Sequence, residues 1–178
     1  MKEMRLPWRG HAGAVFHYPS GEPPVTMVLA TAFAPSRVVH VVPDVSQLSP
    51  AECTVDAVAG TVEQLRQAAV RGITVSRGVV VFTYEDGACL RDEERDYLWE
   101  RFGVPVFEQY LSRTNELLAS ECDAHDGLHL TAGAGARAGF TIDEGRCPCG
   151  DPRPRYIQLS EPDEAAEAER WYPVPAAL

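Results

Sequence analysis

The sequence predicts an α/β protein whose mixed sheet has a parallel strand-helix-strand centre, followed by a shorter antiparallel C-terminal part. Three adjacent segments predict the centre. Residues 78–84 are apolar on both faces, as in a strand buried in the middle of a sheet. Residues 92–102 begin with three acidic residues and end before Gly103, which is typical of a helix. A second strand is expected to begin within residues 104–110. A helix that connects two strands in this way makes a right-handed crossover, and the two strands are then parallel.

Two strands are expected before this centre. Val25 to Thr31 and Arg37 to Val42 are rich in β-branched residues, and the turn Ala34-Pro35-Ser36 separates them. The first 24 residues contain scattered glycines and the pair Pro23-Pro24. We therefore expect them to follow the surface or to form a short hairpin.

The longest helix is expected between these strands and the centre. Ser49 can cap free backbone N–H groups, Pro50 suits the first helical position, and Glu52 completes a capping box. Apolar residues then recur at helical spacing until Gly72 ends the helix; they are Val55, Val58, Val62, Leu65 and Ala69.

Shorter elements are expected after Tyr110. Helices are predicted from Thr114 to Ser120 and from Ser160 to Arg170. Three short strands are predicted between them, and their lengths favour antiparallel pairing; they are Leu128 to Thr131, Phe140 to Asp143 and Tyr156 to Leu159. The sequence contains no internal repeat and no linker, so residues 1–178 are expected to form a single domain.

The charge balance argues against two classes of partner. The chain of 178 residues carries 16 Lys and Arg against 26 Asp and Glu, a formal net charge of -10. Nucleic acids and anionic lipids are bound through clusters of Lys and Arg. No apolar stretch approaches the roughly 20 residues of a membrane span, and the N-terminus has no apolar signal core. We therefore expect a cytoplasmic protein that binds neither nucleic acid nor membrane.

Cysteine and histidine residues concentrate between residues 121 and 150, where they are Cys122, His125, His129, Cys147 and Cys149. Zinc takes four such ligands in a tetrahedron, and the turn Cys147-Pro148-Cys149-Gly150 can direct two thiolates to one ion. A reducing cytoplasm also favours thiolate ligands over disulfides. The sequence therefore predicts a zinc site within the antiparallel C-terminal part.

The spacing of these cysteines and histidines leaves two questions about the site open. Five candidates exceed a tetrahedral set, and either His125 or His129 is the fourth ligand. Four protein ligands would make the site closed and structural, whereas three ligands and a water would leave a position for chemistry.

Four short motifs follow one another in the second half of the chain. They are Phe102-Gly103-Val104-Pro105-Val106 leading to Tyr110, then Glu121-Cys122, Gly127-Leu128-His129-Leu130 and Cys147-Pro148-Cys149-Gly150. In this order they resemble the middle of the phenylacetate-CoA ligase-like family of adenylate-forming, AMP-binding enzymes, over residues 78–158. Because His129 occupies the family's Gly-Leu-His position, the resemblance implies a ligand set of Cys122, His129, Cys147 and Cys149.

The chain departs from this family at the nucleotide motifs. Tyr110-Leu111-Ser112-Arg113-Thr114 replaces the family's Tyr-Gly-x-Thr-Glu, Gly139-Phe140 replaces a Gly-Asp step, and Asp151 replaces an arginine. The 178 residues also lack a phosphate loop ending in lysine and leave no room for the family's C-terminal domain. Adenylyl transfer depends on such charge-stabilising groups. We therefore expect a shortened relative that no longer adenylates.

The expected function is that of a small zinc-binding protein. It would bind a small carboxylate, an acyl thioester, or a partner ligase or carrier protein beside the former acyl pocket near Tyr110. One alternative is a zinc-dependent enzyme of specialised metabolism, with an open zinc site and Glu121 or His125 as acid or base. Another alternative is an incomplete adenylate-forming ligase that a second subunit completes.

Other reactive residues are interpreted as structural. The segment from Gly133 to Gly139 has the wrong spacing for a dinucleotide fingerprint and is expected to be a flexible connection. Ser112 lacks the Gly-x-Ser-x-Gly context of a hydrolase nucleophile. Two cysteines are expected to pack and two histidines to be solvated; these are Cys53 and Cys89, and His11 and His17.

Overall fold

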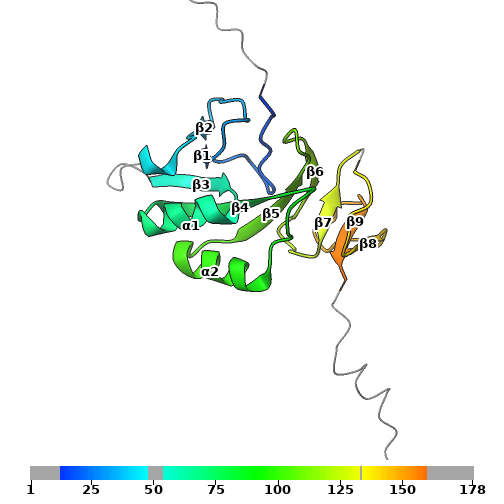
Figure 1. Cartoon of the computed structure of the whole chain (residues 1–178). Coiled ribbons are helices and arrows are strands. Elements are labelled where there is room, and N and C mark those ends of the chain that lie inside the picture. The colour runs from blue at the N-terminus through cyan, green and yellow to red at the C-terminus, as the bar shows by residue number, and fades with distance from the viewer. Residues whose placement is uncertain (1–12, 48–53, 133, 160–178) are drawn as a thin grey trace, which may run out of the picture.

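The computed structural model of the chain describes residues 13–47, 54–132 and 134–159. These residues form a mixed sheet of nine strands in the order β2-β1-β3-β4-β5-β6-β7-β9-β8 (Figure 1). Neighbouring strands from β2 to β5 are parallel, and those from β5 to β8 are antiparallel. The predicted α/β class, with a parallel centre and an antiparallel C-terminal part, is confirmed.

The elements have the following bounds. The parallel strands are β1 (Thr26–Val28), β2 (Val39–Val41), β3 (Thr54–Gly60), β4 (Thr74–Tyr84) and β5 (Val106–Leu111). The antiparallel strands are β6 (Leu117–Ser120), β7 (Leu128–Leu130), β8 (Phe140–Asp143) and β9 (Arg155–Gln158). Helix α1 (Val62–Val70) connects β3 to β4, helix α2 (Asp92–Phe102) connects β4 to β5, and a single 3-10 turn, η1 (Val45–Gln47), follows β2.

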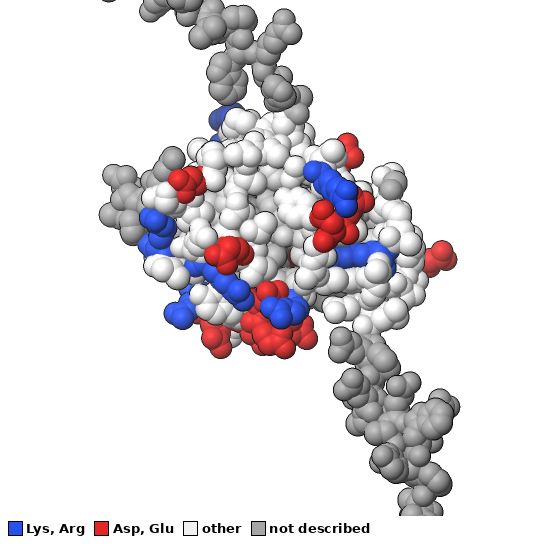
Figure 2. All heavy atoms as spheres, viewed as in Figure 1, with Lys and Arg blue, Asp and Glu red and all other residues white. Residues whose placement is uncertain are grey.

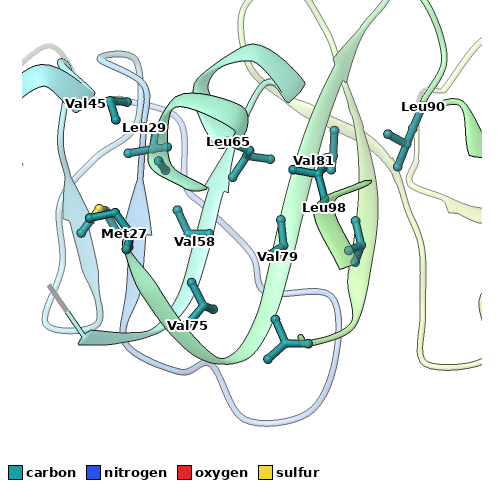
Figure 3. Close-up of a cluster of buried hydrophobic side chains, with 14 residues drawn as sticks. Met27, Leu29, Val45, Val58, Leu65, Val75, Val79, Val81, Leu90 and Leu98 are labelled. Carbon is teal, nitrogen blue, oxygen red and sulfur yellow. The ribbon is translucent and has the colours of Figure 1, made fainter. Parts of the chain in front are cut away.

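Both helices cover one face of the parallel strands (Figure 1). This placement is expected because the two crossovers step across the sheet in the same direction, and right-handed crossovers then fall on one face. Figure 3 shows the resulting core, in which Leu65 of α1 and Leu98 of α2 lie over Val58, Val79 and Val81 of the sheet. All five side chains have 0% exposure. Burial of this apolar layer is the main term that stabilises the parallel half.

The opposite face is covered by the N-terminal segment rather than by a helix. Phe16 contacts the edges of Phe33 and Phe82 at centroid distances of 6.2 and 6.1 Å, and Phe33 stacks on Phe82 at 5.1 Å. Ala14 forms an isolated parallel bridge with Phe33. The part of the first 24 residues that the structure describes therefore supplies a second core, which the prediction of a surface segment missed.

The predicted long helix is wrong over its first half. Residues 54–60 form β3, which pairs with β1 on one side and with β4 on the other. Its last four residues are buried, so the apolar spacing reflects a strand covered on both faces. The helix begins only after Thr61, whose side chain and that of Gln64 form the actual capping box. The proposed cap at Ser49 lies outside the described residues.

The predicted helix from Thr114 to Ser120 is also wrong, because this segment makes a turn and the strand β6. The Ser112 hydroxyl accepts hydrogen bonds from the backbone N–H groups of Thr114 and Glu116 at 3.2 and 3.0 Å. Asn115 takes a positive φ of 65° in the same turn. These contacts close a β5–β6 hairpin, and pairing with β7 on the other side completes the strand.

The remaining differences concern boundaries. Strand β4 begins at Thr74 instead of Gly78, while β1 and β2 are shorter than the strands predicted for them. The predicted helix from Ser160 to Arg170 lies outside the described residues. In the ranges that the structure describes, neither helix has the length and apolar character needed to cross a membrane.

Candidate metal centre

Three separate segments bring four metal-ligating side chains together. Cys122 follows β6, His129 lies in β7, and Cys147 and Cys149 lie between β8 and β9. One ligand atom from each residue lies within 4.8 Å of all the others. The Sγ atoms of Cys122 and Cys147 are 3.6 Å apart, and Sγ of Cys149 is 3.3 Å from Nε2 of His129. The structure therefore places the four predicted ligands where they could hold one metal ion.

The orientation of His129 suits this role. Its side chain is 1% exposed, and Nδ1 lies 3.3 Å from the backbone carbonyl of Arg153. A carbonyl only accepts hydrogen bonds, so Nδ1 carries the proton and Nε2 presents its lone pair to the cysteines. Such a partner on the second ring nitrogen is usual for histidine ligands of metals.

The alternative ligand, His125, is directed away from the cluster. Its Nδ1 lies 3.4 Å from Oε1 of Glu121, and its ring stacks on Phe107 at a centroid distance of 5.0 Å. The structure thus brings His129, and not His125, to the three cysteines.

The Cys147–Gly150 segment forms a tight turn that presents both thiols. The Gly150 N–H donates to the carbonyl of Cys147 at 2.9 Å, and Gly150 has a φ of 86°. The Asp151 N–H donates to Sγ of Cys149 at 3.4 Å. Backbone N–H groups directed at sulfur stabilise a thiolate, so the turn favours metal ligation.

The protein environment shifts the pKa values of the Cys122 and Cys147 thiols in opposite directions. Burial raises the pKa of Cys122 to about 12. Burial also opposes ionisation of Cys147, but hydrogen bonds, led by that from the backbone N–H of Cys149, outweigh it and lower the pKa of Cys147 to about 7. The cluster therefore supplies a thiolate readily at Cys147, whereas a cation is needed to ionise Cys122.

A charged pair flanks the histidine. Arg153 donates to both carboxylate oxygens of Asp151, from Nε at 3.1 and 2.9 Å and from Nη2 at 2.6 Å. These hydrogen bonds lower the pKa of Asp151 to about 2, so this carboxylate is ionised at neutral pH. Its Oδ1 atom lies 3.9 Å from Nδ1 of His129, so a negative charge lies beside the imidazole ring.

A pocket of about 770 Å³ adjoins the cluster and is lined by Cys122 and His129 together with Asp151 and Arg153. Its polar floor is a row across three strands, in which Gln109 pairs with Ser120 and Ser120 with His129. All three side chains are buried, which is unusual for polar residues without a role. The N-terminal segment forms one wall, where the carbonyl of His17 accepts a hydrogen bond from Nε2 of Gln109 at 2.6 Å.

Two other residues that the sequence analysis singled out, Glu121 and Tyr110, are buried and make packing or hydrogen-bond contacts. Glu121 is buried, and its Oε2 accepts hydrogen bonds from Nη1 of Arg95 at 3.0 Å and from the Glu108 N–H at 2.7 Å. Tyr110 is 7% exposed and packs edge-on against Tyr156. Cys89 is half-buried, whereas Cys53 and His11 lie outside the described residues.

One charged residue of the glycine- and alanine-rich segment, Arg137, is buried in the sheet, which the sequence pattern did not predict. Its guanidinium lies 4.0 Å from the ring centroid of Tyr110 and 4.2 Å from that of Phe140. Nη2 donates to Oε1 of Glu108 at 3.0 Å. The sequence predicts a flexible connection here, but over the described residues 134–139 the side chain of Arg137 anchors the segment to the sheet. That lone arginine among small residues is the signal that was available.

Gly127 sets the path of the chain into β7. It has a φ of 82°, and an added Cβ would lie 2.5 Å from the carbonyl oxygen of Tyr156. We expect Gly127→Ala to lower the free energy of unfolding by about 2–5 kcal/mol, through backbone strain and this clash. Urea denaturation measures the loss.

Gly139→Ala is the matched control. Gly139 also has a positive φ, of 78°, but no atom lies within 4 Å of an added Cβ. This variant should lose only about 1–2 kcal/mol from backbone strain. Equal losses in the two variants would show that the close approach at Gly127 is unimportant.

No model of a known protein family matches the chain, and a comparison with curated proteins gives no match either.

Proposed function

We propose that the chain is a zinc-binding module shaped like the central part of a phenylacetate-CoA ligase-like enzyme, and that it does not adenylate. One observation carries the proposal: three cysteines and one histidine place their ligand atoms within 4.8 Å of one another. Zinc–ligand bonds of about 2.3 Å to sulfur and 2.0–2.1 Å to nitrogen imply tetrahedral edges of roughly 3.6–3.8 Å. The distances of 3.6 Å between Cys122 and Cys147 and of 3.3 Å between Cys149 and His129 are close to these values.

The donor set supports a structural role for the ion. Four protein ligands fill a tetrahedral shell, whereas catalytic zinc sites keep one position for water or substrate. Zinc would link the end of β6, strand β7 and the loop between β8 and β9. This arrangement favours a binding module over a zinc-dependent enzyme.

The pocket beside the centre is the better candidate for the ligand site. Tyr110, where the family resemblance suggests an acyl pocket, is covered by Arg137 and is not exposed. The pocket of about 770 Å³ has the size of a small-molecule site, and Arg153, which is paired with Asp151, lies at its wall. A small carboxylate or an acyl thioester is therefore the proposed ligand class, with a ligase or a carrier protein as the source of such a group.

Metal analysis of protein purified without added metal should find about one zinc per chain, and calorimetric titration with ATP and magnesium should be flat. Negligible zinc would overturn the zinc assignment. Measurable ATP binding would instead favour the incomplete ligase, because the module lacks the groups that hold the phosphates.

A further inference from the structure

The four side chains of the cluster differ in exposure. His129 and Cys147 are 1% and 4% exposed, Cys122 is half-buried, and Cys149 is exposed. A thiolate held by a metal ion remains a nucleophile, and reaction with a small oxidant requires access. Cys149 is therefore the sulfur in this cluster that an oxidant from solvent meets first.

A second thiol lies within reach of Cys149. Sγ of Cys122 is within 4.8 Å of Sγ of Cys149 and belongs to a different segment of the chain. Sγ of Cys147 also lies within 4.8 Å, but only Pro148 separates Cys147 from Cys149, so a bond between them would close a small ring across the turn. Cys122 is distant from Cys149 in the sequence, so a bond between these two residues is free of that constraint.

We infer that Cys149 is a modification site for hydrogen peroxide or an organic hydroperoxide, and that its oxidation ends in a Cys122–Cys149 disulfide. The inference rests on the proposed function, since zinc keeps both sulfurs deprotonated. It goes beyond that function because it assigns the metal centre a reactive cysteine in addition to a structural role.

The two steps balance with one hydrogen peroxide. The Cys149 thiolate attacks a peroxide oxygen, so an S–O bond forms, the O–O bond breaks, and hydroxide leaves. The Cys122 thiolate then attacks Sγ of Cys149, so the S–S bond forms, the S–O bond breaks, and a second hydroxide leaves. Two sulfurs are oxidised by one electron each, the peroxide is reduced by two electrons, and the two hydroxides released are neutralised by the acid form of the buffer.

Oxidation removes two of the four ligands and leaves Cys147 and His129. Two protein ligands do not hold zinc as a tetrahedral set of four does, so the ion is released. Cys122 and His129 also line the pocket of about 770 Å³, so the change reaches the wall of the proposed ligand site.

Zinc-loaded wild-type protein treated with one equivalent of hydrogen peroxide tests the inference. A colorimetric chelator should detect release of about one zinc per chain, and the free thiols should fall from the five cysteines of the sequence by two. Peptide mass spectrometry should show a linkage between Cys122 and Cys149 that dithiothreitol reverses. Dimedone added during the reaction should label Cys149.

Cys89→Ser serves as the control, because Cys89 is half-buried and is not one of the cluster cysteines. This variant should release zinc at the wild-type rate. First labelling of Cys122 or Cys147, a linkage that omits Cys149, or zinc release with all thiols still reduced would each overturn the inference. Negligible zinc in the isolated protein would instead overturn the proposed function, and dimedone labelling of the metal-free chain would then still decide whether Cys149 reacts first.

Discussion

Replacing Cys147 by Ser is expected to abolish tight zinc binding and to destabilise the antiparallel half of the protein. Cys147 is 4% exposed and lies 3.6 Å from Cys122, so its sulfur is a central member of the cluster. Zinc bound only by the folded state contributes its binding free energy to folding. We expect the free energy of unfolding to fall by at least about 3–5 kcal/mol, measured by urea denaturation alongside zinc content.

The Cys89→Ser variant controls for the change from sulfur to oxygen in a partly buried position. It should keep wild-type zinc content and lose less than about 1.5 kcal/mol. Chelation of the wild-type protein should reproduce the loss seen in Cys147→Ser, since both remove the ion. If Cys147→Ser unfolds like Cys89→Ser at saturating zinc, the ion contributes little to stability.

Replacing Arg137 by Met is expected to cost about 3–5 kcal/mol in the free energy of unfolding, because it leaves the buried Glu108 carboxylate without its cation. The side chains of Arg137 and Glu108 are 5% and 7% exposed. The Thr83 hydroxyl also donates to Oε1 of Glu108, at 2.7 Å, but a hydroxyl does not neutralise the charge. Thermal and urea unfolding measure the loss.

Two variants sharpen this test. The double variant Arg137→Met, Glu108→Leu removes both charges and should recover much of the stability that the single variant loses. Arg113→Met breaks an ion pair with Asp86 at 3.3 Å, whose side chains are 73% and 56% exposed, and should cost less than about 1 kcal/mol. A double variant less stable than Arg137→Met would show that the pair acts through packing instead of through charge.

The pattern of the sequence predicted the centre of the fold well, because local signals there agree with the tertiary environment. Residues 78–83 of the apolar run are buried in β4, and acidic residues begin α2 while Gly103 ends it with a φ of 67°. The helix predicted over residues 54–60 is wrong because Val55 and Val58 fit helical spacing and a buried strand equally well. Pairing with β1 and β4 decided between the two.

The metal ligands were predicted in a different way. Cysteine and histidine are chemically distinctive, so their concentration between residues 121 and 150 is visible without a structure. The choice between His129 and His125 came from family resemblance, and the structure selects the same residue. His129 lies in β7 with its ring held by the carbonyl of Arg153, while Glu121 and Phe107 hold His125 elsewhere.

By itself, the sequence determined the α/β class, the parallel centre and the group of cysteines and histidines from which a metal site could be built, because these depend on local periodicity and on side-chain chemistry. Only the tertiary structure decided that residues 54–60 are a strand, that Arg137 is buried against Glu108, and that Gln109, Ser120 and His129 share one polar row. Each of these depends on partners from distant parts of the chain. A residue's burial and charge environment are set by such partners, and no local pattern records them.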